Sequence, residues 1–221
     1  MEFLKIDKLV DVSKTIASGL FMRATYPWEV LPFIGEFIKE LGKELPSDEY
    51  NSPSENVWIH KTAKIAPSAS ITGPCIICEN AEIRQCAFIR GNAIVGRKSV
   101  LGNSCEMKNA ILFDEVQVPH FNYCGDSILG YKSHMGAGSI TSNVRQDKQN
   151  IVLHINGEHI ETGLRKFGAI LGDNVEVGCN AVMNPGSIIG RGTNVYPLSM
   201  VRGFVPAGSI YKNENEIVQK L

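Results

Sequence analysis

The sequence predicts a mainly β fold: a single-stranded left-handed parallel β-helix of hexapeptide repeats with an N-terminal helical appendage. An aliphatic residue recurs at every sixth position between Ile59 and Met107, and the period returns between Leu171 and Val201. An isolated helix has a period near 3.6 and an isolated strand a period of 2, so neither explains a strict six. The members of the first ladder are Ile59, Ile65, Ile71, Ile77, Ile83, Ile89, Val95, Leu101 and Met107.

The limits of this period divide the chain. Residues 1–50 lack it, and their apolar residues follow helical spacing, which predicts a helix from about 32 to 45 and a shorter one near 13–22. Residues 51–56 are polar and contain proline, which indicates a linker. The β-helix is expected over 57–210, with an excursion at 144–168 whose Asn156-Gly157 pair predicts a β-hairpin. Residues 211–221 form a charged tail.

Composition excludes several classes of protein. The net charge is −1, from 22 basic and 23 acidic residues, which argues against a nucleic-acid-binding surface. No apolar run approaches the ~20 residues of a membrane span. The N-terminus has no signal-peptide pattern, so a cytoplasmic location is expected.

The six cysteines are expected to be reduced thiols in that compartment. Cys75 and Cys78 form one C-x-x-C pair, but no second pair has the spacing of a zinc finger. Both lie in a predicted β-helix rung, which favours packed or surface thiols over a metal site.

From Phe88 onward the chain resembles the C-terminal acetyltransferase domain of the bifunctional glucosamine-1-phosphate acetyltransferase/N-acetylglucosamine-1-phosphate uridyltransferase family. Five segments match in the same order, which makes the resemblance stronger than any single motif. They are FIRGNAIVG, GNSCEMKNAIL, VPHFNYCGDSILG, MGAGSITSN and RKFGAILGDNVEVG. The resemblance implies an acetyl-CoA-dependent N-acetyltransferase that acts on an amino-sugar phosphate such as glucosamine 1-phosphate, toward UDP-N-acetylglucosamine-type nucleotide sugars, and that assembles as a homotrimer.

The resemblance also implies roles for particular residues. His120 matches the catalytic histidine, and an imidazole has a suitable pKa to take the proton of an attacking amine. Asn143 matches a position near the acetyl-CoA thioester and is the second catalytic candidate. The candidate substrate-binding residues are Arg90, Lys108, Tyr123, His134 and Lys166, of which the three basic residues match a sugar-phosphate clamp. The candidate cofactor-binding residues are Ala137, Asn143 and Cys179. No metal is required for acyl transfer.

Departures from the family pattern accompany these matches. His134 stands where the family usually has an asparagine, Val144 replaces a tyrosine, and Cys179 replaces a serine. Residues 1–56 are too short for the family's nucleotidyltransferase domain. The chain is therefore not expected to be a nucleotidyltransferase on its own, and a separate nucleotidyltransferase is a candidate partner.

Two other functions remain open at this point. A metal site of the γ-type carbonic anhydrase kind is one, since His154 and His159 have the H-x4-H spacing and His120 precedes them. However, these two histidines flank the predicted hairpin turn and would face each other across it. The other alternative is a non-catalytic β-helix partner of a separate nucleotidyltransferase.

Overall fold

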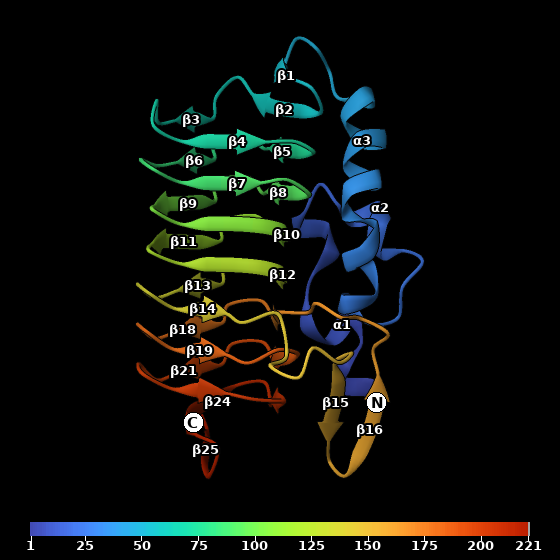
Figure 1. Cartoon of the computed structure of the whole chain (residues 1–221), viewed down its shortest axis with the longest axis vertical. Coiled ribbons are helices and arrows are strands. Elements are labelled where there is room, and N and C mark those ends of the chain that lie inside the picture. The colour runs from blue at the N-terminus through green and yellow to red at the C-terminus, as the bar shows by residue number, and fades with distance from the viewer. Residues whose placement is uncertain (221) are drawn as a thin grey trace.

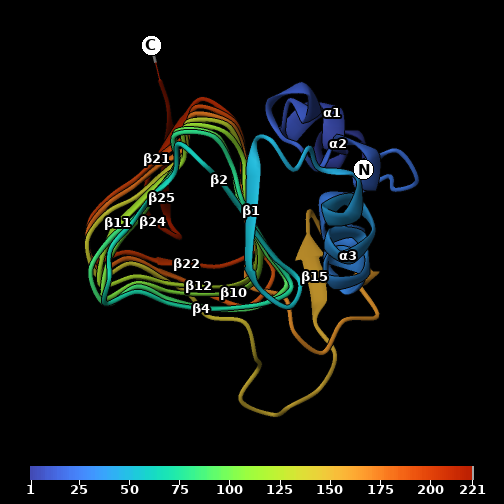
Figure 2. The same cartoon turned by 90° about the horizontal axis from the view of Figure 1, so that it is seen from above.

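The computed structural model describes residues 1–220 and confirms the predicted β-helix with its N-terminal helical appendage (Figure 1). The chain winds into a β-solenoid of about nine turns. Its cross-section is a triangle when seen along the coil axis (Figure 2). Parallel pairing of each strand with the strand one turn later leaves the aliphatic ladder inside, where Ile77, Ile89 and Met107 are fully buried.

The strands form three faces, named here A, B and C. Face A contains β4 (Ser70–Thr72), β7 (Phe88–Arg90), the first halves of β10 (Glu106–Leu112) and β12 (Tyr123–Leu129), β14 (Ile140–Thr141), β19 (Val182–Met183) and β22 (Met200–Val201). Face B contains β2 (Val57–His60), β5 (Cys75–Ile77), β8 (Ala93–Val95), the second halves of β10 and β12, β17 (Ala169–Leu171), β20 (Ser187–Ile189) and β23 (Phe204–Val205).

Face C contains β3 (Lys64–Ile65), β6 (Glu82–Ile83), β9 (Val100–Asn103), β11 (Gln117–His120), β13 (His134–Met135), β18 (Glu176–Val177), β21 (Asn194–Val195) and β24 (Ser209–Asn213).

Strands β10 and β12 are long because each bends around the corner between faces A and B, called the A–B corner. The bend falls at Asn109 (φ 47°) and Asp126 (φ 48°), and Asn92 (φ 50°) takes the same conformation one turn earlier. Asn and Asp tolerate this left-handed region better than other non-glycine residues, which explains their use here. The corner places polar side chains in register on successive turns.

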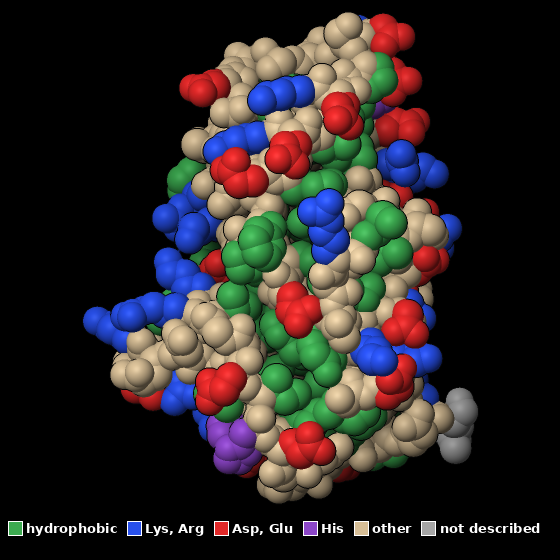
Figure 3. Space-filling model, turned by 90° about the vertical axis from the view of Figure 1, so that its right-hand side faces the viewer, with side chains coloured by type: hydrophobic (Ala, Val, Ile, Leu, Met, Phe, Trp, Pro, Cys, Tyr) green, Lys and Arg blue, Asp and Glu red, His purple; other side chains and the backbone are tan. Residues whose placement is uncertain are grey.

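The appendage covers face B. It consists of three short 3₁₀ helices and three α-helices: η1 (Glu2–Leu4), α1 (Ile6–Leu9), η2 (Val12–Lys14), α2 (Ser18–Phe21), η3 (Pro27–Phe33) and α3 (Ile34–Glu44). Helix α3 contacts β5, β8 and β10. Its buried Ile34 and Ile38 belong to the same apolar core as the outward-facing Ile76 and Ile94 of face B. The outer surface on this side mixes acidic and basic side chains around an apolar strip (Figure 3).

Three segments differ from the sequence expectations. The shorter helix expected near 13–22 is two separate pieces, η2 and α2. Within the expected 51–56 linker, residues of β1 (Tyr50–Ser54) pair antiparallel with β2 and cover the first turn of the coil. The expected tail forms β25 (Glu216–Gln219), which pairs antiparallel with β24 at the other end. Both terminal strands cover a coil end that would otherwise expose an open edge.

The excursion from the coil forms the expected hairpin of β15 (Val152–Ile155) and β16 (Glu158–Glu161). Its turn residues Asn156 (φ 52°) and Gly157 (φ 80°) both have positive φ, as a two-residue hairpin turn requires. No helix of residues 1–220 is both long and apolar enough to span a membrane.

Candidate functional site

Face A carries a cluster of polar side chains that project from neighbouring turns next to the A–B corner. Arg90 and Lys108 occupy equivalent outward positions in β7 and β10, one turn apart, and Lys108 is paired with Gly125 of β12 on the next turn. Because Gly125 has no side chain, the ring and hydroxyl of Tyr123 can lie over it, next to Lys108. Lys166 reaches the same place from the returning end of the excursion.

The positive charges of this cluster lie close together. The pKa of Lys108 is lowered, mainly because the side chain is partly buried, and the nearby cations Lys166 and Arg90 lower it further. The carboxylate of Asp126 acts in the opposite direction. Arg90 donates to Glu106 at 2.6 Å, and this ion pair raises the pKa of the guanidinium. Such a group of cations favours a dianionic phosphate, which would neutralise them.

Tyr123 and Asn143 stand beside these cations. Asn143 Nδ2 donates to the Tyr123 hydroxyl at 3.1 Å and to Asp126 Oδ2 at 2.5 Å. Burial raises the pKa of the Tyr123 phenol, and the charge of Asp126 raises it further. Tyr123 is therefore a neutral hydroxyl at physiological pH, able both to donate and to accept a hydrogen bond.

His120 ends β11 at the corner where face C turns into face A, called the C–A corner. Its backbone is fixed, because its N–H donates to the buried Asn122 Oδ1 at 3.0 Å and its carbonyl accepts from Gly138 N at 3.0 Å. The side chain is exposed, and within residues 1–220 its ring makes no hydrogen bond that meets ordinary distance criteria. A fixed backbone with an imidazole free to accept a proton suits a general base.

Two of the candidate cofactor-binding residues lie in register with His120. Ala137 O accepts from Asn180 N at 2.9 Å, and Cys179 O accepts from Leu198 N at 2.9 Å, so His120, Ala137 and Cys179 occupy the C–A corner on successive turns. Ala137 and Cys179 have small side chains, and Cys179 is exposed, so neither would block a pantetheine arm laid along this corner.

Within one chain, the predicted site residues lie in three separate places. Arg90, Lys108, Tyr123, Asn143 and Lys166 converge near the A–B corner, whereas Ala137 and Cys179 lie with His120 at the C–A corner. His134 lies on face C, where its Nδ1 is 2.8 Å from Glu176 Oε2. It does not join the other substrate-binding candidates within one chain.

Sequence reasoning missed Asn109, Glu106 and Asp126. Only 4% of Asp126 is exposed, although it is charged, and Asn109 Nδ2 donates to its Oδ1 at 2.9 Å. The residues Asn109, Asp126 and Asn143 are spaced by 17 positions, about one turn of the coil. That spacing was the sequence signal from which their stacking on successive turns could have been predicted.

Within one chain, the described hairpin histidines and the cysteines are not grouped as metal ligands. His154 and His159 face each other across the hairpin with ring centroids 4.4 Å apart, as the turn predicted, while His120 lies on the coil. Among residues 1–220, no three His, Cys, Asp or Glu side chains are grouped to hold a metal ion. Cys75 and Cys78 are buried and unbridged, and burial raises the pKa of the Cys78 thiol to about 12.

A cleft of about 450 Å³ lies between the hairpin and the last turns of the coil. Its lining residues are Phe3, His154, Ile155, Asn156, Arg202, Gly203, Phe204, Pro206 and Ile217. None of the candidate acyl-transfer residues borders it.

Comparison with known proteins gives consistent relatives. The family model described as the GMPPB C-terminal domain matches residues 71–193. The chain is 30% identical over 221 residues to the bifunctional protein GlmU of Methanococcus maripaludis, a match that covers 97% of this chain and 54% of that protein. It is 32% identical over 174 residues to a bifunctional sugar-1-phosphate nucleotidylyltransferase/acetyltransferase of Sulfurisphaera tokodaii, covering 71% and 43%.

The chain thus spans about half the length of such curated relatives. Among solved structures, a hexapeptide transferase family protein from Anaplasma phagocytophilum has a TM-score of 0.42 at 19% identity, covering 75% of this chain and 79% of that one. A TM-score of that size supports no argument about function.

Proposed function

The chain belongs to the GMPPB C-terminal domain family, and from this premise we propose that it is a hexapeptide-repeat acyltransferase that moves the acetyl group of acetyl-CoA to an amino-sugar phosphate. The observation that carries the proposal is the convergence of Lys108, Lys166 and Arg90 beside Tyr123 and Asn143. Three cations on one open surface suit a phosphate, and the neighbouring hydroxyl and amide suit a sugar. The relatives named for acetyl transfer add support.

The proposed reaction assigns each group a step. The three cations hold the phosphate and so fix the position of the amine. His120 takes the proton that the amine loses as its nitrogen bonds to the acetyl carbon and the carbon–sulfur bond breaks. The proton then passes to the departing thiolate, which leaves as free thiol. Ala137 and Cys179 line the path of the pantetheine arm.

A thiol-release assay tests this function. Acetyl-CoA is supplied with a panel of amino sugars and amino-sugar phosphates, and glucosamine 1-phosphate is the first substrate to try. We expect thiol release to require both the amine and the phosphate. No release with any member of the panel would favour the non-catalytic β-helix partner instead.

We further propose that three copies of the chain assemble, because face A and the C–A corner expose large apolar side chains that one chain leaves uncovered. Phe121 is 64% exposed, Leu198 79% and Met200 55%, while Phe88 and Ile140 on the same face are also exposed. Covering this surface removes apolar area from water. It would also bring the C–A corner of one copy near the phosphate cluster of another.

Light scattering at micromolar concentration is therefore expected to give the mass of three chains. Leu198→Asp combined with Met200→Asp should shift the mass toward one chain, because two charges would then need to be buried at the contact. A single-chain mass for the unmodified protein would contradict the trimer.

A further inference from the structure

A chain of hydrogen bonds joins the N-terminal appendage to the candidate site. The Leu31 carbonyl, in η3, accepts from Asn109 Nδ2 at 3.3 Å, and the same nitrogen donates to Asp126 Oδ1 at 2.9 Å. The other carboxylate oxygen, Asp126 Oδ2, accepts from Asn143 Nδ2 at 2.5 Å, and that nitrogen also donates to the Tyr123 hydroxyl at 3.1 Å. Four side chains and one backbone carbonyl are thus connected in series.

This arrangement determines what Asn143 can offer a substrate. A side-chain amide has two N–H donors and one carbonyl acceptor. Both donors of Asn143 are used, one by Asp126 and one by Tyr123. An ionised carboxylate can accept hydrogen bonds but cannot donate them. Asp126 in that form therefore keeps the amide nitrogen of Asn143, not its oxygen, turned toward itself. The Asn143 carbonyl oxygen is then left for an N–H or O–H of the substrate.

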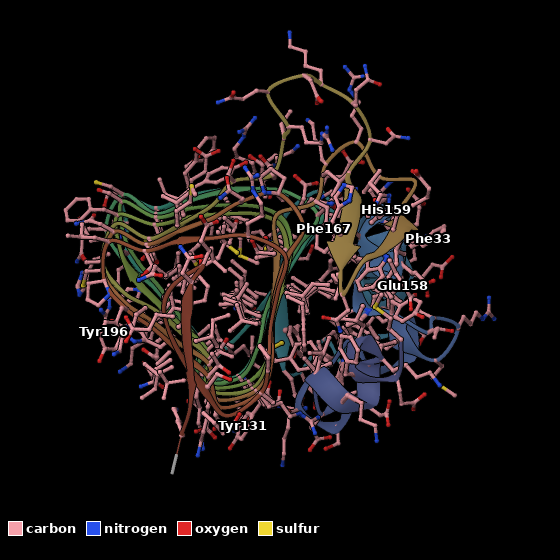
Figure 4. The ribbon with its side chains drawn as sticks, turned by 90° about the horizontal axis from the view of Figure 1, so that it is seen from below. Phe33, Tyr131, Glu158, His159, Phe167 and Tyr196 are labelled. Atoms are coloured by element: carbon pink, nitrogen blue, oxygen red, sulfur yellow. The ribbon has the colours of Figure 1, made fainter. Side chains whose placement is uncertain are left out.

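A second contact links the appendage to Lys166. The Trp28 indole of η3 stacks on the ring of Phe167, with centroids 5.9 Å apart and the planes 29° apart. Phe167 follows Lys166 directly, and its backbone N–H donates to Asn143 O at 3.0 Å. Phe167 lies where the coil meets the hairpin (Figure 4). The same 3₁₀ helix therefore supports both ends of the excursion.

Asp126 also balances the charge of the cluster. It is the buried carboxylate beside Lys108, and its charge opposes the effect of burial and of Lys166 on that ammonium. Glu106, by contrast, is engaged with Arg90 at 2.6 Å. A neutral side chain at position 126 would leave Lys108 without this compensation.

We propose that the appendage is a positioning element of the active site, which acts through the relay of Asn109 and Asp126 to hold Asn143 as a hydrogen-bond acceptor and through the stacked Trp28 to place Lys166. This inference rests on the proposed acyltransferase function. Asn109 and Asp126 are positioning residues, since they reach the substrate only through Asn143 and Lys108. The natural role of Asn143 is then to accept a hydrogen bond from the attacking amine, whose lone pair is thereby aimed at the acetyl carbon.

The A–B corner offers matched variants for the test. Asp126→Asn keeps the size of the side chain and removes its charge, and Asn tolerates the left-handed conformation there. Asn109→Gly breaks the relay at a position whose positive φ glycine readily adopts. Asn92→Gly is the control, because Asn92 has the same conformation one turn away and touches the appendage at Gly35, but belongs to no part of the relay.

In the thiol-release assay we expect Asp126→Asn and Asn109→Gly to lower kcat by about three- to tenfold, with little change in the KM for acetyl-CoA. Asn92→Gly should behave as the unmodified protein. The urea midpoints of unfolding of the three variants should be close to that of the unmodified protein. In addition, Asp126→Asn should move the loss of sugar-phosphate binding at high pH to lower pH, since the pKa of Lys108 falls further when the opposing carboxylate is lost. A purely structural role would not produce that shift.

Hydrogen exchange at the Phe167 amide provides a measurement that needs no substrate. Loss of the relay should loosen Asn143. We therefore expect the Phe167 amide to exchange faster in Asp126→Asn and Asn109→Gly, and at the rate of the unmodified protein in Asn92→Gly. Unchanged exchange at Phe167 would overturn the positioning role whether or not the chain acetylates sugars. Faster exchange with an inactive unmodified protein would support the relay and overturn the proposed function alone.

Discussion

Replacing His120 with Ala is expected to lower the turnover of acetyl transfer by roughly 100- to 10,000-fold, the range typical of losing a general base. An amine that attacks a thioester must lose a proton as the carbon–nitrogen bond forms. The exposed imidazole at the C–A corner is the candidate acceptor, and its position next to Ala137 places it on the proposed path of the thioester. Steady-state thiol release measures the effect.

The fold should tolerate this change. The His120 side chain is exposed, while its backbone is held by Asn122, whose amide in turn donates to Gly136 O at 2.7 Å and Ser139 O at 3.1 Å. The unfolding midpoint of the variant should therefore match that of the unmodified protein.

His159→Ala is the matched control for a lost imidazole, because His159 is exposed on the hairpin. Acyl transfer should not respond to it. Undiminished activity of His120→Ala would show that another group takes the proton.

The β-helix and the hairpin could be predicted from the sequence because both depend on local sequence patterns. A six-residue period requires only one inward aliphatic side chain per rung, and the hairpin requires only the Asn156-Gly157 turn. The helical spacing of the N-terminal residues indicated a helix packed onto the β-helix or a neighbouring subunit, but which face it covers was not predicted, although a signal existed. Strands such as β5 and β8 contain three consecutive apolar residues, and all three are buried. An apolar residue that points outward indicates that something covers the face.

The site was predicted less completely, for a different reason. The basic residues and Tyr123 follow from the resemblance, and Arg90, Lys108 and Lys166 do lie together. Asp126 gains its importance only from Asn109 and Asn143 on other turns, and Asn109 in turn donates to a backbone carbonyl of the appendage. A backbone carbonyl carries no sequence signal, so the link from Leu31 to the site requires the three-dimensional structure.

Replacing Lys108 or Lys166 with Ala is expected to weaken binding of glucosamine 1-phosphate by about tenfold or more, since a charge-assisted hydrogen bond contributes roughly 1.5–3 kcal/mol. Lys108 should show the larger effect. Its partial burial lowers its pKa and the nearby Lys166 and Arg90 lower it further, against the opposing effect of Asp126, and a bound dianion would relieve the repulsion between the cations. Arg90→Ala should have a smaller effect, because the guanidinium must first share its contact with Glu106.

Isothermal titration with glucosamine 1-phosphate, and separately with acetyl-CoA, measures these changes. Acetyl-CoA binding should be nearly unaffected, and glucosamine lacking the phosphate should bind poorly to every form. Arg84→Ala is the control for Arg90→Ala, because Arg84 is also paired with a glutamate, Glu82 at 3.0 Å, but lies on face C.

The same preparation separates acyl transfer from zinc chemistry. A zinc enzyme would contain stoichiometric metal bound through His120, His154 and His159, would lose activity on chelation, and would not respond to the lysine substitutions. Within residues 1–220 of one chain these three histidines are not grouped to hold a metal ion, so such a site would need contacts between copies, and metal analysis is performed on the assembled protein. One zinc per chain together with no sugar-phosphate binding would overturn the phosphate clamp, whereas weakened binding in Lys108→Ala and Lys166→Ala without metal would establish it.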